Sequence, residues 1–164
     1  MSKYKLIPNY SQEQIAAKQL NGLQWTLNHV LKGSDFYREH LAQAGLKSAQ
    51  EIKSLEDIRQ LPFTTTSDLR NGYPYPLLSV PLNEVVRLHA SSGTTGKRKI
   101  MAYTQNDTET FSLQMARCYE LAGLTPEDRV QIAVGYGLWT AGIGFQLGCE
   151  KLGCMAIPIG PGNI

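Results

Sequence analysis

A run of seven small, hydroxyl-bearing and basic residues lies between two segments that both have the pattern of β-strands. The run is Ser91-Ser92-Gly93-Thr94-Thr95-Gly96-Lys97. Residues 85–90 before it and 99–104 after it alternate and are rich in strand-forming side chains. This pattern predicts a glycine-rich loop that joins two strands, so this part of the chain is expected to contain a sheet.

The residue types in this loop are suited to holding a polyphosphate. Glycine allows the backbone to turn sharply and to approach a ligand closely. Successive backbone N–H groups in such a loop form an anion-binding concavity, while hydroxyls and lysine add donors and positive charge. The Walker A pattern is not met, because it requires glycine where Ser91 stands and a hydroxyl residue where Arg98 stands. A flexible polar turn is the alternative interpretation, since these residue types are common in turns.

The chain before the loop has the pattern of helices. Ser11 and Gln14 form a capping-box pattern ahead of an apolar stripe, and Gly33 is expected to close this helix in a left-handed conformation. We therefore predict a helical N-terminal segment over residues 1–81 and a partial α/β subdomain over residues 82–164, which carries the loop.

The second part has the order of a β–α–β unit. Residues 129–134 and 154–159 have strand character, and residues 140–152 between them have helical character. This order predicts two parallel strands joined by a crossover helix. The predicted fold class is therefore α/β.

The composition is ordinary for a soluble globular protein, with 18% charged and 42% hydrophobic residues. The formal net charge of +2 gives no reason to expect a nucleic-acid partner. The N-terminus lacks an apolar segment of signal-peptide length, so a cytoplasmic location is expected. Residues 131–149 are uncharged but contain several glycines, which predicts a strand, a turn and a buried helix and no membrane span.

Cysteine and histidine spacing argues against a metal site and against a disulfide framework. The cysteines are odd in number and form no C-x-x-C pair, so they are expected to be buried, reduced thiols: Cys118, Cys149 and Cys154. The histidines are too scattered for metal spacing: His29, His40 and His89. Of these, His89 is expected to be a hydrogen-bonded structural histidine, and contact with a nucleotide is the alternative.

The segment from His89 to Lys97 resembles the phosphate-binding loop of the phenylacetate–CoA ligase family, within the adenylate-forming acyl-CoA synthetase superfamily. Further motifs resemble the same family in the same order: Leu61-Pro62-Phe63-Thr64-Thr65, Asp68-Leu69-Arg70, Tyr73-Pro74, Gly135-Tyr136-Gly137-Leu138-Trp139-Thr140 and Ile157-Pro158-Ile159-Gly160-Pro161-Gly162-Asn163. The resemblance covers almost the whole chain but only the N-terminal portion of the family's enzymes. It implies a helical segment followed by part of the α/β N-terminal domain of an adenylate-forming enzyme. Arg98 stands where the family usually has proline.

The resemblance implies the N-terminal portion of an ATP-dependent, AMP-forming aryl-acid ligase of the phenylacetate type, with a role in phenylacetate catabolism. The acid's carboxylate attacks the α-phosphate of ATP, and the thiol of coenzyme A then attacks the acyl-adenylate. The implied ATP phosphate-binding residues are Ser91, Ser92, Gly93, Thr94, Thr95, Gly96 and Lys97. The implied aryl-acid pocket contains Tyr136 and Trp139, for which the alternative is a role as core aromatics. ATP, Mg²⁺ and coenzyme A are implied, but this stretch contains no counterpart of the family's catalytic or Mg²⁺-binding residues.

Two other functions stay open at this point. One is a related AMP-forming synthetase with another acid or acceptor, such as a deazaflavin-adenylylating synthetase. The other is a non-catalytic, truncated nucleotide-binding or assembly module. We expect the 164 residues alone to be inactive, because the family's adenine, ribose, magnesium and lid motifs have no counterpart in them. Homodimerisation or self-association is also expected, because an unpaired sheet edge and apolar helix faces promote it.

Overall fold

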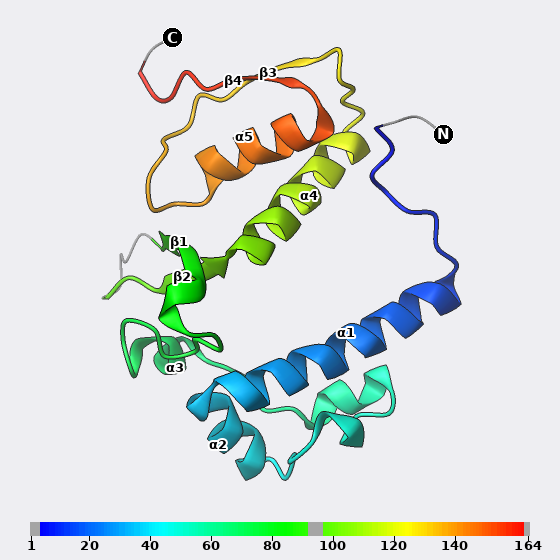
Figure 1. The fold of residues 1–164 in the computed structure, drawn as a ribbon, viewed down its shortest axis with the longest axis vertical. Coiled ribbons are helices and arrows are strands. Elements are labelled where there is room, and N and C mark those ends of the chain that lie inside the picture. The colour runs from blue at the N-terminus through cyan, green and yellow to red at the C-terminus, as the bar shows by residue number, and fades with distance from the viewer. Residues whose placement is uncertain (1–3, 92–96, 163–164) are drawn as a thin grey trace. The chain divides into compact units, whose positions relative to one another are not determined.

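The computed structural model describes residues 4–91 and 97–162, and Figure 1 shows the arrangement of helices and strands. The chain divides into two compact units. One comprises Asn9–Asn83, and the other comprises the residues from Glu84 onward together with those up to Pro8. The sequence-based division into domains at residues 81 and 82 is a separate statement and stays a prediction.

The unit Asn9–Asn83 is helical. Its elements are α1 (Gln12–Gly33), α2 (Asp35–Gln43), the 3₁₀ helices η1 (Ala49–Glu51) and η2 (Leu55–Gln60), and α3 (Thr66–Arg70). Helix α1 begins as predicted, because the Ser11 hydroxyl accepts from the Gln14 N–H and the Gln14 side chain accepts from the Ser11 N–H. These reciprocal bonds satisfy backbone donors that the first turn would otherwise leave unpaired.

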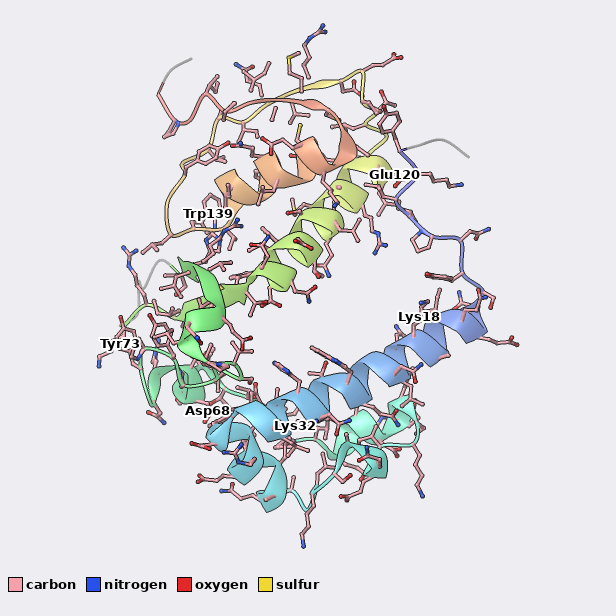
Figure 2. The ribbon with its side chains drawn as sticks, viewed as in Figure 1. Lys18, Lys32, Asp68, Tyr73, Glu120 and Trp139 are labelled. Atoms are coloured by element: carbon pink, nitrogen blue, oxygen red, sulfur yellow. The ribbon has the colours of Figure 1, made fainter. Side chains whose placement is uncertain are left out.

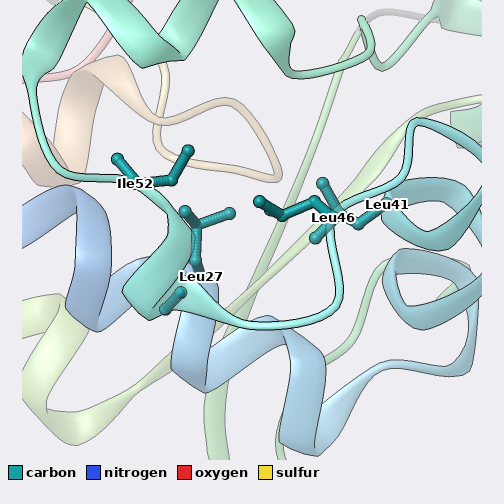
Figure 3. Close-up of a cluster of buried hydrophobic side chains, with 5 residues drawn as sticks. Leu27, Leu41, Leu46 and Ile52 are labelled. Carbon is teal, nitrogen blue, oxygen red and sulfur yellow. The ribbon is translucent and has the colours of Figure 1, made fainter.

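The core of this unit forms where the apolar face of α1 meets the segments that follow it. Its buried members come from α1, α2, η1 and the connections around η1: Leu27, Leu41, Leu46, Ala49 and Ile52 (Figure 3). Among them, Ile52 and Ala49 have no exposed surface. Burying side chains of this kind contributes about 1.5–3 kcal/mol for each large residue, so this cluster supplies the unit's main stabilisation.

The prediction that Gly33 closes α1 in a left-handed conformation is wrong. Gly33 is the last residue of the helix, and Ser34 is the C-cap with an extended backbone. A Cβ added to Gly33 would lie 1.9 Å from the carbonyl oxygen of Ser79. Glycine is therefore required here for a close approach of two backbones and not for its own φ angle. A left-handed glycine follows α2 instead, at Gly45 with φ of 85°.

The other unit contains the two predicted strand pairs. Its elements are β1 (Val85–Ala90), β2 (Ile100–Thr104), α4 (Gln105–Leu121), β3 (Arg129–Gln131), α5 (Ala141–Leu152) and β4 (Met155–Ile157). The short 3₁₀ helix η3 (Leu82–Glu84) spans the division between the two units in the sequence. Strands β1 and β2 are antiparallel, so the prediction that the loop joins two strands is confirmed. Strands β3 and β4 are parallel with α5 between them in sequence, which confirms the crossover.

Strands β3 and β4 are shorter than predicted. Beyond Gln131, the Ile132 N–H donates to the Ile157 carbonyl at 2.9 Å, and the Gly160 N–H donates to the Ile132 carbonyl at 3.1 Å. The next residue on β4 is Pro158, which has no N–H to donate, and the β3 side soon enters a glycine-rich turn. The pairing therefore stops before the strand-like composition does.

Helices α4 and α5 pack closely because α5 presents glycines to α4 (Figure 1). A Cβ added to Gly144 would lie 2.7 Å from the ring of Phe111, and one added to Gly148 would lie 2.5 Å from the Cβ of Met115. A larger side chain at Gly144 would have to displace the Phe111 ring, and one at Gly148 would meet the backbone of α4 at Met115 and Ala116. The uncharged stretch 131–149 is divided among the end of β3, a turn and α5, as predicted. Within the described ranges, no helix is long and apolar enough to cross a membrane.

The residues before Pro8 are held on α4 by one carboxylate. Glu120, labelled in Figure 2, accepts from the backbone N–H groups of Leu6 and Ile7 at 2.8 and 2.9 Å. The Arg117 Nε donates to the Leu6 carbonyl at 3.0 Å. This start of the chain therefore packs with the second unit, although its sequence position places it in the predicted helical segment.

The cysteines are free thiols but differ in burial. Cys149 and Cys154 are buried beside the α4–α5 contact, as expected, whereas Cys118 is exposed, so the prediction of burial is wrong for that residue. Cys118 lies on α4 two residues after Ala116, which has no exposed surface. A helix turns by about 200° over two residues, so Cys118 lies on the side of α4 opposite to the buried Ala116.

Candidate functional site

The two ends of the predicted phosphate loop are hydrogen-bonded to each other. The Ser91 N–H donates to the Lys99 carbonyl at 3.1 Å, and the Lys99 N–H donates to the Ser91 Oγ at 3.1 Å. The second bond uses the Ser91 hydroxyl oxygen as acceptor and leaves its hydrogen able to donate to another group. The loop base is thus fixed immediately after β1 and just before β2.

The described part of the loop carries positive charge toward solvent. Lys97 and Arg98 are exposed, and Lys99 is half-buried. The other predicted phosphate-binding residues lie outside the described residues: Ser92, Gly93, Thr94, Thr95 and Gly96. Three consecutive cations beside a hydroxyl are suited to a polyanion, because charge-assisted hydrogen bonds to phosphate are stronger than neutral ones.

The second part of the site is the aromatic turn, residues 135–140, which connects β3 to α5. Its Leu138 carbonyl accepts from the Ala90 N–H at 2.8 Å and from the Nδ1 of His89 at 3.1 Å. Ala90 directly precedes Ser91, the first residue of the loop. The predicted phosphate-binding segment and the predicted acid-binding segment are therefore joined by two hydrogen bonds to one oxygen.

The two predicted pocket aromatics lie on this turn with their side chains partly exposed. Tyr136 is 41% exposed and Trp139 is 60% exposed, so neither is enclosed within this unit (Figure 2 labels Trp139). Partial desolvation, and to a smaller extent the negative charge of Glu150, raise the pKa of the Tyr136 phenol above its ordinary value. The phenol therefore stays protonated at neutral pH and can donate a hydrogen bond. The turn also leads directly into the N-terminus of α5, where the helix dipole favours anions.

His89 is hydrogen-bonded, as the sequence predicts, but its place between the loop and the turn was not foreseen. It is 2% exposed, and its ring lies edge-on to that of Tyr103 with centroids 5.3 Å apart. Its Nε2 is buried and has no hydrogen-bond partner among the described residues, and the same is true of the Nη1 of Arg87. Alternation along β1 places both residues on one face, which is the only sequence signal that links them.

Elsewhere in the described residues, candidate binding or catalytic groups are fewer. In the described residues there is no group of three or more His, Cys, Asp or Glu side chains that could hold a metal ion. A shallow hollow of about 420 Å³ on the helical unit is lined by Trp25, Asn28, His29, Lys32 and Gln50. The ring of His29 stacks on Trp25 there, at 5.0 Å between centroids. None of these residues belongs to a motif that the sequence singled out.

Known proteins with similar sequences share one name. The chain is 40% identical over 99% of its length to the phenylacetate–coenzyme A ligase of Escherichia coli K12, of which it spans 37%. It is 43% identical over 93% of its length to that of Pseudomonas putida, spanning 35%. For the Thermus thermophilus enzyme of the same name the identity is 41% over 92% of the chain, spanning 34%. The chain thus covers about a third of each relative, and no family model matches it.

Solved structures place the fold among acyl-CoA ligases. A 2-hydroxyisobutyryl-CoA ligase in complex with 2-HIB-AMP and CoA, in the thioesterification state, matches with a TM-score of 0.84 and 28% identity over 93% of this chain and 33% of the other. The same ligase in the postadenylation state matches with a TM-score of 0.83 at 23% identity, over 99% of this chain and 37% of the other, which supports the fold alone. The α/β fold expected for part of an adenylate-forming ligase is confirmed. Over nearly all of its length this chain is similar to an N-terminal portion of the phenylacetate–CoA ligases, which confirms the resemblance that its motifs indicate.

Proposed function

We propose that this protein supplies the ATP-phosphate loop and the aryl-acid turn of an ATP-dependent, AMP-forming CoA ligase of the phenylacetate type. The observation that carries the proposal is the pair of hydrogen bonds from Ala90 and His89 to the Leu138 carbonyl. They join the segment that is proposed to bind the ATP phosphates to the segment that is proposed to bind the acid. The similarity to enzymes named phenylacetate–coenzyme A ligase supports the choice of acid and acceptor.

The first half-reaction joins two anions, because a carboxylate attacks the α-phosphate of ATP and pyrophosphate leaves. Electrostatic stabilisation and positioning are therefore the main contributions that a protein can make. In this proposal Lys97 and the Ser91 hydroxyl neutralise and orient the β- and γ-phosphates. Ser92, Gly93, Thr94, Thr95 and Gly96 take part through their hydroxyl and backbone N–H groups.

The aromatic turn is proposed to hold the acid. Tyr136 and Trp139 present flat, partly exposed rings that can pack against an aryl group at low conformational-entropy cost. The N-terminus of α5 favours the acid's carboxylate. Coenzyme A is the acceptor in the second half-reaction, and Mg²⁺ would assist the first. No step is assigned to Mg²⁺, since no cluster of potential ligands is found in the described residues.

The setting is part of the same proposal. We assign the enzyme to phenylacetate catabolism in the cytoplasm, with ATP, coenzyme A and an aryl acid as its small-molecule partners. We also propose that it forms a homodimer. Exposed apolar side chains on β4, at Met155 and Ile157, support self-association. Size-exclusion chromatography with light scattering measures the oligomeric state directly.

The test is ATP–pyrophosphate exchange in the natural full-length protein, with ATP and the aryl acid varied separately. Lys97→Ala is expected to lower kcat/KM for ATP about 10- to 100-fold, because a hydrogen bond to a charged group contributes about 1.5–3 kcal/mol. Tyr136→Ala is expected to raise the KM for the aryl acid more than that for ATP. Lys47→Ala, which removes an exposed lysine from the helical unit, is the matched control. No acid-dependent exchange by the unsubstituted protein would rule out the proposed function.

A further inference from the structure

His89 occupies the junction between strand β1, the phosphate loop and the aromatic turn. Its ring is almost completely buried, and its Nδ1 lies 3.1 Å from the Leu138 carbonyl oxygen. A carbonyl oxygen only accepts hydrogen bonds, so the hydrogen of this bond is on Nδ1. The tautomer of His89 is thereby fixed by the turn itself.

The imidazole ring also contacts an aromatic side chain of the neighbouring strand. Tyr103 on β2 meets it edge-on at 5.3 Å between centroids, and Phe111 on α4 lies 6.1 Å from Tyr103 in turn. The ring therefore sits between the sheet, α4 and the turn, where packing limits its rotation. A side chain held in this way can keep β1 and the aromatic turn at a fixed distance from each other.

The Leu138 peptide group receives two donors from adjacent residues of one strand. The hydrogen bond from the Ala90 N–H alone would fix the 2.8 Å distance between the Ala90 nitrogen and the Leu138 oxygen. It would still allow the Leu138 peptide plane to rotate about that bond. The second donor, on a side chain that leaves the strand in a different direction, restricts that pivot. Tyr136 and Trp139 lie within two residues of Leu138, so the orientation of this peptide also determines where their rings lie.

We infer that His89 is a positioning residue, which holds the aromatic turn at a fixed distance and angle from the first residue of the phosphate loop. The inference rests on the proposed function, in which the turn holds the acid and the loop holds ATP. In-line attack requires the carboxylate and the α-phosphate to be aligned, and a misplacement of about 1 Å costs about 100-fold in rate. His89 contributes to that alignment without contacting either substrate.

Three substitutions separate this role from a purely structural one. His89→Ala removes the donor to Leu138. His89→Asn keeps an amide N–H near the position of Nδ1, whereas His89→Gln places its amide near the position of Nε2 and so serves as the matched control. In the natural full-length protein, His89→Ala and His89→Gln are expected to lower kcat for acid-dependent ATP–pyrophosphate exchange about 10- to 100-fold. The KM for ATP should change less than about twofold, and His89→Asn should recover most of the rate.

A second measurement follows the turn without relying on activity. The protein is labelled with 5-fluorotryptophan, and the ¹⁹F resonances are assigned by their loss in Trp139→Phe and Trp25→Phe. His89→Ala and His89→Gln should shift or broaden the Trp139 resonance, and His89→Asn should restore it. The Trp25 resonance, from the helical unit, should not change.

The rates and the fluorine spectra together distinguish a positioning role of His89 from a purely structural one. An unchanged Trp139 resonance together with an unchanged rate in His89→Ala would overturn the positioning role. Equal losses in all three variants, with changes in both resonances and a lower melting temperature, would also overturn it in favour of general structural support. If the unsubstituted protein shows no exchange, the proposed function fails, while the fluorine spectra still decide whether His89 holds the turn.

Discussion

Gly142→Ala would add a methyl group that points into the aromatic turn. Gly142 is the second residue of α5, and a Cβ built on it lies 2.6 Å from the Gly135 carbonyl oxygen and 3.2 Å from Cδ2 of Tyr136. Ordinary van der Waals contact begins at 3.4 Å, so the backbone at Gly135 must withdraw by about 0.8 Å. The nearest atom belongs to the main chain, so no simple side-chain rotation relieves the clash.

The expected effects on stability and on catalysis are of similar size in free energy. Overpacking of this kind costs about 1–3 kcal/mol, and the higher helix propensity of alanine offsets up to about 1 kcal/mol of that loss. The free energy of unfolding should therefore fall by no more than about 3 kcal/mol. Displacement of the turn by nearly 1 Å should lower kcat/KM for the aryl acid about 10- to 100-fold. That fold-change corresponds to about 1.4–2.7 kcal/mol, so the loss in catalysis is comparable to the loss in stability, and the two must be measured separately.

The assay is ATP–pyrophosphate exchange with the acid varied at saturating ATP, alongside thermal unfolding. Gly22→Ala is the matched control, because Gly22 lies inside α1 and no described atom lies within 4 Å of its added Cβ. It should gain about 0.5–1 kcal/mol of stability and keep its exchange rate. Unchanged kcat and KM for the acid in a folded Gly142→Ala variant would refute the argument that the turn's position controls acid activation.

Two further predictions concern the packing that supports this site. Glu120→Ala should lower the free energy of unfolding by about 1–3 kcal/mol, because the backbone N–H groups of Leu6 and Ile7 lose their acceptor. Amide hydrogen exchange at these two residues should become faster. An unchanged exchange rate there would contradict this prediction. Burial, followed by the neighbouring thiol, raises the pKa of Cys149 to about 11, so at pH 8 iodoacetamide should modify the exposed Cys118 first, as peptide mass mapping would detect. The folded-state pKa of Cys149 lies above its unfolded value, so its contribution to stability should be complete below about pH 8.5 and be lost as the pH rises toward 11. Equal modification of the two thiols in the folded protein would show that Cys149 is not protected.

Interactions between near neighbours in sequence could be predicted from the residues alone. The capping bonds between Ser11 and Gln14 span three residues, and the alternation in β1 and β2 shows in consecutive side chains. Such signals depend on local geometry that any surrounding fold would preserve. The order of strand, helix and strand also predicted the parallel pairing of β3 with β4, because a crossover of that length allows little else.

Interactions between distant segments could not be predicted. The position of Gly33 at a helix end was visible, but the approach of Ser79 that requires a glycine there depends on how the helical unit closes on itself. Likewise, Cys118 and Cys149 are the same residue type, and only helix packing decides that one is exposed and the other buried. In each case the deciding contact is made by residues far apart in the chain.

Residue type and local order are enough to predict the two segments of the candidate site: a loop of hydroxyl residues, glycines and lysine between strands, and an aromatic turn before a helix. Their chemistry follows from residue type and local order, which folding does not alter. Only the tertiary structure decided that the two are joined, through a single carbonyl at Leu138 that is 49 residues from His89. That bond exists because β1 ends beside the turn that precedes α5, and no local pattern encodes such a meeting. The physical reason is that side-chain chemistry is a property of each residue, whereas alignment is a property of the packed whole.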